Sequence, residues 1–580
     1  RPHQQQWQPP RPPVPTPTRS RCPEPMAESQ KRRRYDRQLR MWGEHGQEAL
    51  ERCKLCLVNG SATGTETLKN LVLPGIGSFT VVDGAVVTAR DLGNNFFLDE
   101  SHIGRPRAEC VTAMLQELNE HVRGSYVNDD VTALLESNPF FLDEFTIVAA
   151  TQLPEPALRR LALACAARSI PLVNLRAYGL AGLVRVAAGE HVVAEGHPDN
   201  TPSDLRVCAP FPELLAYAES RFGGADSLSA NERKHIPYVV LLMQAVQAYK
   251  DGHGGALPST YREKQAVKAL LSAQAEKWFG VLGAEDAINF EEAKAAVNTA
   301  LAPPSVPGDV RAVLEAAQGH VEAMRPSSED ATSPSSVDAN SASNRTFWIL
   351  AAALQRFVNG EGKGALPLLG TVPDMTADTS SFVQLSGVYR DRAQAEAEAV
   401  HAHVQSILTG LGHPASWITL DQTRSFCKNA HTIQWLRYRS FEDEYTPATA
   451  RVKHIASLMD EGPAASFYLL LRAADAFHSQ YNRFPGAMDN DIESDVPLLK
   501  QCAHQLLAEL RTQASTPLAI RDDLVVEMCR YGAAEIHSVA AIVGGVGSQE
   551  IIKLLTSQFV PLNNLYVYNG LDGTSITAEV

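Results

Sequence analysis

Short apolar runs alternate with helical patterns along the first third of the chain. Strand-like runs occur at Lys54–Val58, Ser78–Val82, Phe145–Ala150 and Pro171–Asn174, and helical patterns between them include Ala108–Glu120 and Glu155–Arg168. Strands that alternate with helices form parallel βαβ units. The pattern therefore predicts an α/β fold with a doubly wound, mostly parallel sheet over residues 26–190.

The pattern changes after residue 190. Stretches rich in Ala, Leu and Glu dominate residues 191–510 and predict helices. The α/β pattern returns in residues 511–580, with a Gly-containing helix at Ser538–Thr556 and a strand at Asn564–Tyr568. The simplest organisation is one Rossmann-like α/β domain interrupted by a large, mainly helical insertion. Residues 1–25 are rich in Pro and lack the apolar stretch of a signal peptide, so we expect a disordered leader.

Composition and charge argue against several classes of function. The net charge of −14 comes without a basic stripe, so we expect no nucleic-acid partner. No apolar run approaches the roughly 20 residues that cross a bilayer, so we expect no membrane association. The nine cysteines are scattered, apart from Cys53-x-x-Cys56. That pair has no second pair downstream, so it favours core packing over zinc, and we expect no metal site. An odd, unpatterned cysteine count fits a reducing compartment inside the cell.

The segment after the first strand is typical of a nucleotide-binding unit with an altered loop. Lys54–Val58 leads into Asn59–Gly64, which is followed by a helical pattern and by a second strand that ends at Asp83. Glycines in such a loop let the backbone approach phosphates closely. Gly60 and Gly64 are present, but Asn59, Ser61 and Ala62 stand where glycines are expected. The sequence predicts that the architecture is kept and that the phosphate site is lost.

A second candidate lies before the first strand, in the segment Tyr35–Gly43. Leu39 and Trp42 fall three residues apart, so one helical face can bury them while Arg37 projects elsewhere. Spacing alone leaves two interpretations open. Arg37 either belongs to a solvated helix face, or its guanidinium stabilises negative charge on a phosphate.

These segments resemble the adenylation domain of ubiquitin-like-modifier activating enzymes. The resemblance rests on Tyr35–Gly43, Val82–Gly84, Gly93–Phe97, Ile103–Glu109, Tyr531–Glu535 and Gly544–Lys553. It covers both ends of the chain, which explains the interrupted α/β domain. In that family the insertion carries, or derives from, the catalytic-cysteine domain.

Three departures separate this chain from the active members. They have a Gly-x-Gly-Gly-x-Gly loop, a second carboxylate where Ala85 stands, and an ATP-holding arginine where Asn95 stands. The resemblance therefore implies that Gly60, Gly64, Asp83 and Asn95 are remnants of a site that no longer works. We expect this chain to bind no cofactor.

The thioester cysteine of the family is also missing. Cys427 has Lys428 and His431 nearby, but it lacks the Pro-x-Cys-Thr context of active members. Cys208 has no supporting context either. A structural role is favoured for both thiols.

A chain with this fold and without either centre resembles the regulatory subunits of neddylation-activating enzymes. The large insertion and the segments Leu366–Met375 and Cys529–Gly532 carry this part of the resemblance. It implies a heterodimer with the catalytic subunit, which binds Mg-ATP and activates the Nedd-eight/Rub modifier. It further implies location in the cytoplasm and nucleus.

The resemblance also assigns contacts with the catalytic subunit. Arg37 matches a family arginine that reaches the partner's ATP, and the expected contact residues are Arg37, Trp42, Asp374 and Asp378. Three alternatives remain: an active homodimeric adenylating enzyme, a pure scaffold with an inert Arg37, and an NAD-dependent oxidoreductase. The last needs an intact Gly-rich turn, which the chain lacks.

Overall fold

The computed structural model describes residues 18–19, 28–199, 204–284, 286–302, 305–325, 339–488, 491–511 and 520–580. The chain divides into two compact units, one formed by Arg1–His191 with Leu436–Val580 and the other by Val192–Trp435. It crosses between them within β8 (Glu190–Val193) and β9 (Gln434–Arg437). Most of the expected leader, residues 1–25, lies outside the described residues.

The first unit is built on a twisted mixed sheet. Its parallel strands are β2 (Lys54–Val58), β3 (Ser78–Val82), β4 (Arg123–Val127), β5 (Ile147–Thr151) and β6 (Leu172–Tyr178). The full order is β1-β4-β3-β2-β5-β6-β7-β10-β11, in which β1 (Thr18–Arg19), β7 (Ala181–Ala187), β10 (Leu565–Asn569) and β11 (Thr574–Ala578) pair antiparallel with their neighbours. The strand order reverses between β2 and β5, where α/β sheets form their ligand crevice.

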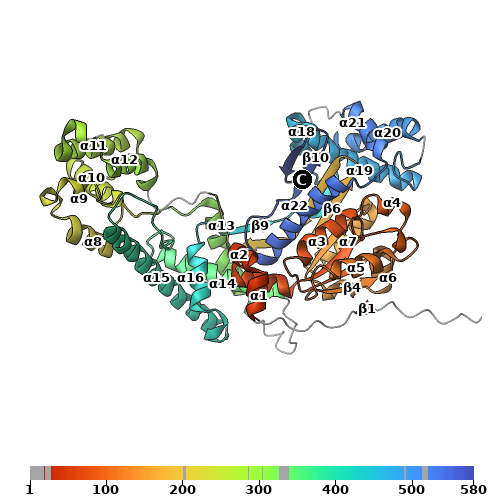
Figure 1. Ribbon diagram of the computed structural model, residues 1–580, viewed down its shortest axis with the longest axis horizontal. Helices are drawn as coiled ribbons and strands as arrows, with labels where there is room; N and C mark the ends of the chain where they lie inside the picture. The colour runs from red at the N-terminus through yellow and green to blue at the C-terminus, as the bar shows by residue number, and fades with distance from the viewer. Residues whose placement is uncertain are drawn as a thin grey trace, which may run out of the picture. The chain divides into compact units, whose positions relative to one another are not determined.

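Helices cover both faces of this sheet, which confirms the doubly wound prediction. One face packs against α2 (Asp36–Arg52), α3 (Ala62–Val72), α5 (Arg107–Gln116) and α22 (His537–Thr556). The other packs against α6 (Val131–Ser137) and α7 (Glu155–Ala166). α22 and β10 come from the C-terminal end of the chain and complete the domain that the N-terminal end begins (Figure 1). The shorter helices are α1 (Glu28–Arg34) and α4 (Ala89–Leu92).

The expectation about apolar runs needs a correction at α22. This helix is the one in the described part of the chain that is long and apolar enough, by length and composition, to cross a membrane. Its most apolar window is 61% buried inside the protein. Val543 and Ile551 of α22 lie in the same apolar core as Leu57 of β2. α22 is therefore the central core helix of the sheet, because a helix that is apolar on several faces suits burial.

The insertion ends earlier than predicted, near residue 435 and not near 510. The helices after it are α17 (Phe441–Tyr445), α18 (Val452–Glu461), α19 (Pro463–Tyr481), α20 (Ile492–Arg511) and α21 (Asp522–Tyr531), all in the first unit. Phe467 and Leu470 of α19 share a core with Val567 of β10. The helical pattern alone cannot distinguish a helix that covers the sheet from one that belongs to the insertion.

The second unit is mainly helical, as predicted. Its helices are α8 (Pro212–Phe222), α9 (Ala230–Arg233), α10 (Tyr238–Gly252), α11 (Tyr261–Ala284), α12 (Ile288–Ala300), α13 (Gly308–Ala323), α14 (Ala339–Asn359), α15 (Thr379–Gly410) and α16 (Leu420–Lys428). They surround two apolar cores, of which Phe290 and Val400 are fully buried representatives.

Candidate functional site

A cleft of about 820 Å³ lies at the carboxyl ends of the parallel strands. This is where a nucleotide binds in folds of this class. Its walls are formed by Asn59, Ser61, Asp83, Gly84, Ala85, Arg90, Arg107, Asn128, Asp129, Asp130, Gln152, Arg176, Tyr178, Phe484, Ala487, Gly532, Ala533 and Glu535.

The loop after β2 is held by bonds within the protein. Asn59 adopts a left-handed conformation (φ 67°), its backbone N–H donates to the Val82 carbonyl at 2.9 Å, and its side-chain amide donates to the Thr151 carbonyl at 2.8 Å. The side chain of Ser61 is hydrogen-bonded to the Thr151 hydroxyl at 3.1 Å and accepts from the Gly64 N–H at 3.4 Å. Side chains therefore occupy space that a glycine-rich loop leaves open to phosphate.

The two remaining glycines are explained by packing. A Cβ at Gly60 would lie 2.8 Å from a methyl group of Val111, and a Cβ at Gly64 would lie 2.6 Å from the Asn59 carbonyl oxygen. Both contacts are closer than real Cβ atoms tolerate. Gly60 and Gly64 thus allow the loop to pack against its own neighbours, with or without a ligand.

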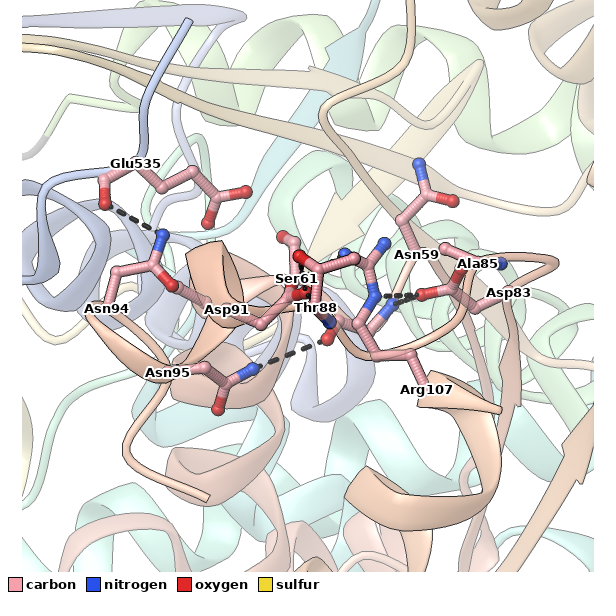
Figure 2. Close-up of polar contacts among 12 residues, drawn as sticks. Asn59, Ser61, Asp83, Ala85, Thr88, Asp91, Asn94, Asn95, Arg107 and Glu535 are labelled. Carbon is pink, nitrogen blue, oxygen red and sulfur yellow. Dashed lines mark hydrogen bonds and ion pairs between the residues drawn. The ribbon is translucent and has the colours of Figure 1, made fainter. Parts of the chain in front are cut away.

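The amino end of α3 is occupied by a carboxylate of the same chain. Glu535 accepts hydrogen bonds from the Thr63 N–H at 2.7 Å and from the Thr63 hydroxyl at 3.0 Å. The Asn94 amide donates to the main-chain carbonyl of Glu535 at 3.0 Å (Figure 2). Helix N-termini attract anions because their N–H groups are unpaired and the helix dipole is positive there. Glu535 therefore occupies the position that suits a phosphate group.

Asp83, at the end of β3, is also fully engaged. One carboxylate oxygen accepts from the Gly60 N–H at 2.8 Å and from Arg107 at 2.7 Å, and the other accepts from the Ala85 N–H at 2.8 Å. Arg107 reaches Asp91 as well, at 2.9 Å (Figure 2). Burial lowers the pKa of Arg107, but the two carboxylates outweigh it and raise that pKa above its ordinary value. The bonds that Asp83 would offer to a ribose are thus made within the chain.

Asn95 is hydrogen-bonded to the loop and does not line the cleft. The residue is 3% exposed; its side-chain oxygen accepts from the Thr65 hydroxyl at 3.2 Å and from the Phe97 N–H at 3.1 Å, and its amide reaches the Gly60 carbonyl at 3.5 Å. The structure therefore gathers Gly60, Gly64, Asp83 and Asn95 in one place, as the resemblance implies, but all four serve the fold.

The expected contact residues Arg37 and Trp42 lie on α2 and outside the cleft. Arg37 is exposed in the first turn, and among the described residues it has no hydrogen bond or ion pair. Trp42 is 6% exposed within the core, and its indole N–H donates to the Gln47 side chain at 3.2 Å. A partner contact by Trp42 stays a prediction, and its visible role is to anchor the helix that carries Arg37.

Asp374 and Asp378 belong to the second unit. Asp374 is exposed. Asp378 precedes α15 and accepts a hydrogen bond from the Ser381 N–H at 2.9 Å, which makes it the N-cap of that helix. Burial acts to raise the pKa of Asp378, but the hydrogen bonds from Ser381 outweigh it, so this pKa lies below its ordinary value. Their contact with a partner stays a prediction.

Burial disfavours the reactive thiolate at both cysteine candidates. Cys427 is 2% exposed, and burial raises the pKa of its thiol to about 12, with a smaller contribution from Glu396. Burial also raises the pKa of Cys208. Cys53 and Cys56 are buried in the core, as the sequence predicts. Among the described residues there is no group of three or more His, Cys, Asp or Glu side chains that could hold a metal ion.

Comparison with known proteins identifies the family. The ThiF family matches residues 35–580. The NEDD8-activating enzyme E1 regulatory subunit of Danio rerio is 41% identical over 95% of this chain and 99% of its own length. The same subunit of Xenopus laevis is 42% identical over 95% and 99%, and AXR1, the NEDD8-activating enzyme E1 regulatory subunit of Arabidopsis thaliana, is 40% identical over 93% and 95%. The chain belongs to the ThiF family and, within it, to the family of NEDD8-activating enzyme E1 regulatory subunits. NEDD8 is the modifier that is called Nedd-eight above, so these relatives confirm the resemblance to the regulatory subunits. The match to the ThiF family confirms the Rossmann-like fold class.

The sequence did not predict the roles of two side chains that line the cleft, Glu535 and Arg107. Glu535 and Arg107 both fall in segments that carry the resemblance, but their roles depend on contacts with distant residues. Glu535 and Thr63 are 472 positions apart in the chain. The available signal was a carboxylate two residues before an apolar helix.

Proposed function

We propose that this chain acts as the regulatory half of a heterodimer, and that the catalytic subunit binds Mg-ATP. The catalytic subunit adenylates the C-terminal carboxylate of NEDD8 and then transfers the modifier to its own cysteine thiol. The observation that supports this division of labour is that the polar groups of the cleft already bond to one another within the chain. Glu535 lies at the amino end of α3, and the bonds of Asp83 are already used by Arg107 and by the backbone.

The chain contributes one group to the reaction, the guanidinium of Arg37. Arg37 is exposed at the start of α2, in the helical segment before the kink at Gly43, and this segment is anchored in the core by Trp42. An arginine supplied from a neighbouring subunit stabilises the negative charge that develops on transferring phosphates. Arg37 thus completes the ATP site of the catalytic subunit.

The test is Arg37→Ala in the co-expressed heterodimer. We expect association to be preserved and NEDD8-dependent ATP–pyrophosphate exchange to fall by about 10²-fold or more, because an arginine acting in trans is worth at least that much. Arg40→Ala is the matched control. Arg40 lies on the same helix, is 78% exposed and pairs with Asp36 at 2.9 Å. Equal rates for wild type and Arg37→Ala would favour the scaffold alternative.

A second measurement distinguishes this proposal from an active homodimeric adenylating enzyme. The purified chain alone is expected to catalyse no exchange, because the groups of its own cleft that would hold phosphate and ribose are already bonded within the chain. Exchange by the chain alone would support an active homodimeric enzyme. We further propose that the heterodimer works in both cytoplasm and nucleus, which fluorescence microscopy of a tagged chain would check. We propose no nucleic-acid or membrane partner.

A further inference from the structure

The segment that carries Glu535 has an unusual backbone. Gly532 and Ala533 are both left-handed, with φ of 54° and 65°, and the Gly179 N–H donates to the Ala534 carbonyl at 2.8 Å. The left-handed region is disfavoured for Ala, so the surrounding contacts must hold this turn. The turn brings the Glu535 carboxylate to the amino end of α3.

The same segment begins the core helix α22. His537 is its first residue and lies 3.3 Å from the Glu66 carboxylate of α3. Farther along, Gly544 lies so close to α3 that an added Cβ would be 3.0 Å from the Thr67 backbone nitrogen. Glu535 therefore connects the amino end of α3 to the start of the helix that packs along it.

The charge of the cleft opposes a further anion. Four carboxylates line it (Asp83, Asp129, Asp130 and Glu535) against three guanidinium groups (Arg90, Arg107 and Arg176). Arg107 is paired with Asp83, and Arg176 is paired with Asp475 at 2.7 Å. Arg90 is exposed at the rim. A phosphate group at the amino end of α3 would have to displace Glu535 from the Thr63 N–H and hydroxyl.

We propose that Glu535 is an internal substitute for phosphate. Its carboxylate takes the anion position at the amino end of α3, excludes free phosphate and nucleotide from the cleft, and holds the start of α22 against α3 without a ligand. The conformation of this unit is consequently independent of ATP concentration. This inference does not depend on the role proposed for Arg37.

Hydrogen exchange of the heterodimer, read by mass spectrometry on peptides covering residues 59–72, tests the proposal. These peptides belong to this chain, so nucleotide bound to the catalytic subunit does not obscure them. In Glu535→Ala we expect the amides at the start of α3 to exchange about tenfold faster than in wild type, because opening there no longer breaks a charged hydrogen bond. Inorganic phosphate should slow exchange again in the variant and leave wild type unchanged.

Two further variants keep the test decisive. Glu535→Gln keeps the size and an accepting oxygen but removes the charge, so it should fall between wild type and Glu535→Ala. Glu579→Ala removes a carboxylate that pairs with Arg451 at 2.6 Å and does not line the cleft, so it should match wild type. Phosphate protection of wild type would overturn the proposal. So would unchanged exchange in both Glu535 variants; if Glu535→Ala does not fold, unchanged exchange in Glu535→Gln overturns it alone.

Discussion

The thiol of Cys427 lies within α16 and contacts the apolar core of the second unit. With a pKa near 12, only about one thiol in 10⁵ is ionised at pH 7. The thiolate is the nucleophile, so a neighbouring Lys428 cannot make this residue reactive while the core excludes water. Burial therefore disfavours thioester chemistry at Cys427.

Cys427→Ser should therefore leave the transfer of NEDD8 to the catalytic subunit unchanged in the heterodimer. Iodoacetamide should modify native Cys427 slowly even at pH 9, where the ionised fraction is still about 0.1%. Cys208 is the internal comparison, because it is partly exposed and should react sooner. Rapid alkylation of Cys427, followed by peptide mass spectrometry, would contradict its burial.

Residue identities reveal what a site has lost more readily than what has replaced it. The substitutions at Asn59, Ser61 and Ala85 are visible in the sequence because glycine and carboxylate have few substitutes at a phosphate site. The replacement by Glu535 is a contact across the fold, so no local spacing reports it. The exposure of Arg37 is likewise a property of packing.

At the scale of elements, the close approach of α3 and α22 holds the two ends of the chain together. Gly544 lies at this crossing, where an added Cβ would come within 2.9 Å of the Glu66 Cβ. The next residue, Gly545, has no atom within 4 Å of the same position. The two glycines therefore sit in one helix but face different surroundings.

Gly544→Ala should lower the free energy of unfolding of the α/β unit by about 1–3 kcal/mol, because the two helices must move apart. Gly545→Ala should be neutral or stabilising by up to about 1 kcal/mol, since Ala favours a helix interior. Chemical denaturation of the two variants measures both effects. Equal stability would show that the crossing can relax without cost.

The accuracy of the predicted elements follows from how each segment is buried. β2 and β3 were predicted with the observed bounds, because strands buried on both faces are continuous apolar runs. β4 (Arg123–Val127) was missed since it contains Arg, Gly and Ser and is only partly buried. α19 and α20 were predicted as helices but assigned to the insertion, because periodicity identifies a helix and not its packing partner.

At the scale of the whole molecule, the proposed heterodimer can involve the surface of either of the two units. The second unit offers Asp374, which is exposed, and Asp378, which caps α15. Reversing the charge at Asp378 removes a cap worth about 1 kcal/mol, so it changes the unit as well as any interface. Asp374 is the cleaner probe of association.

Asp374→Lys should weaken binding to the catalytic subunit several-fold at low salt while the melting temperature of the chain stays unchanged. The effect should shrink as salt is raised, because exposed charges are screened within about 10 Å at 0.1 M ionic strength. Asp378→Lys should lower the melting temperature and the affinity together, and Asp378→Asn, which retains a capping oxygen, should recover the melting temperature. Titration calorimetry at two salt concentrations measures the affinities. If both charge reversals bind like wild type, the predicted contacts of Asp374 and Asp378 with the catalytic subunit are wrong.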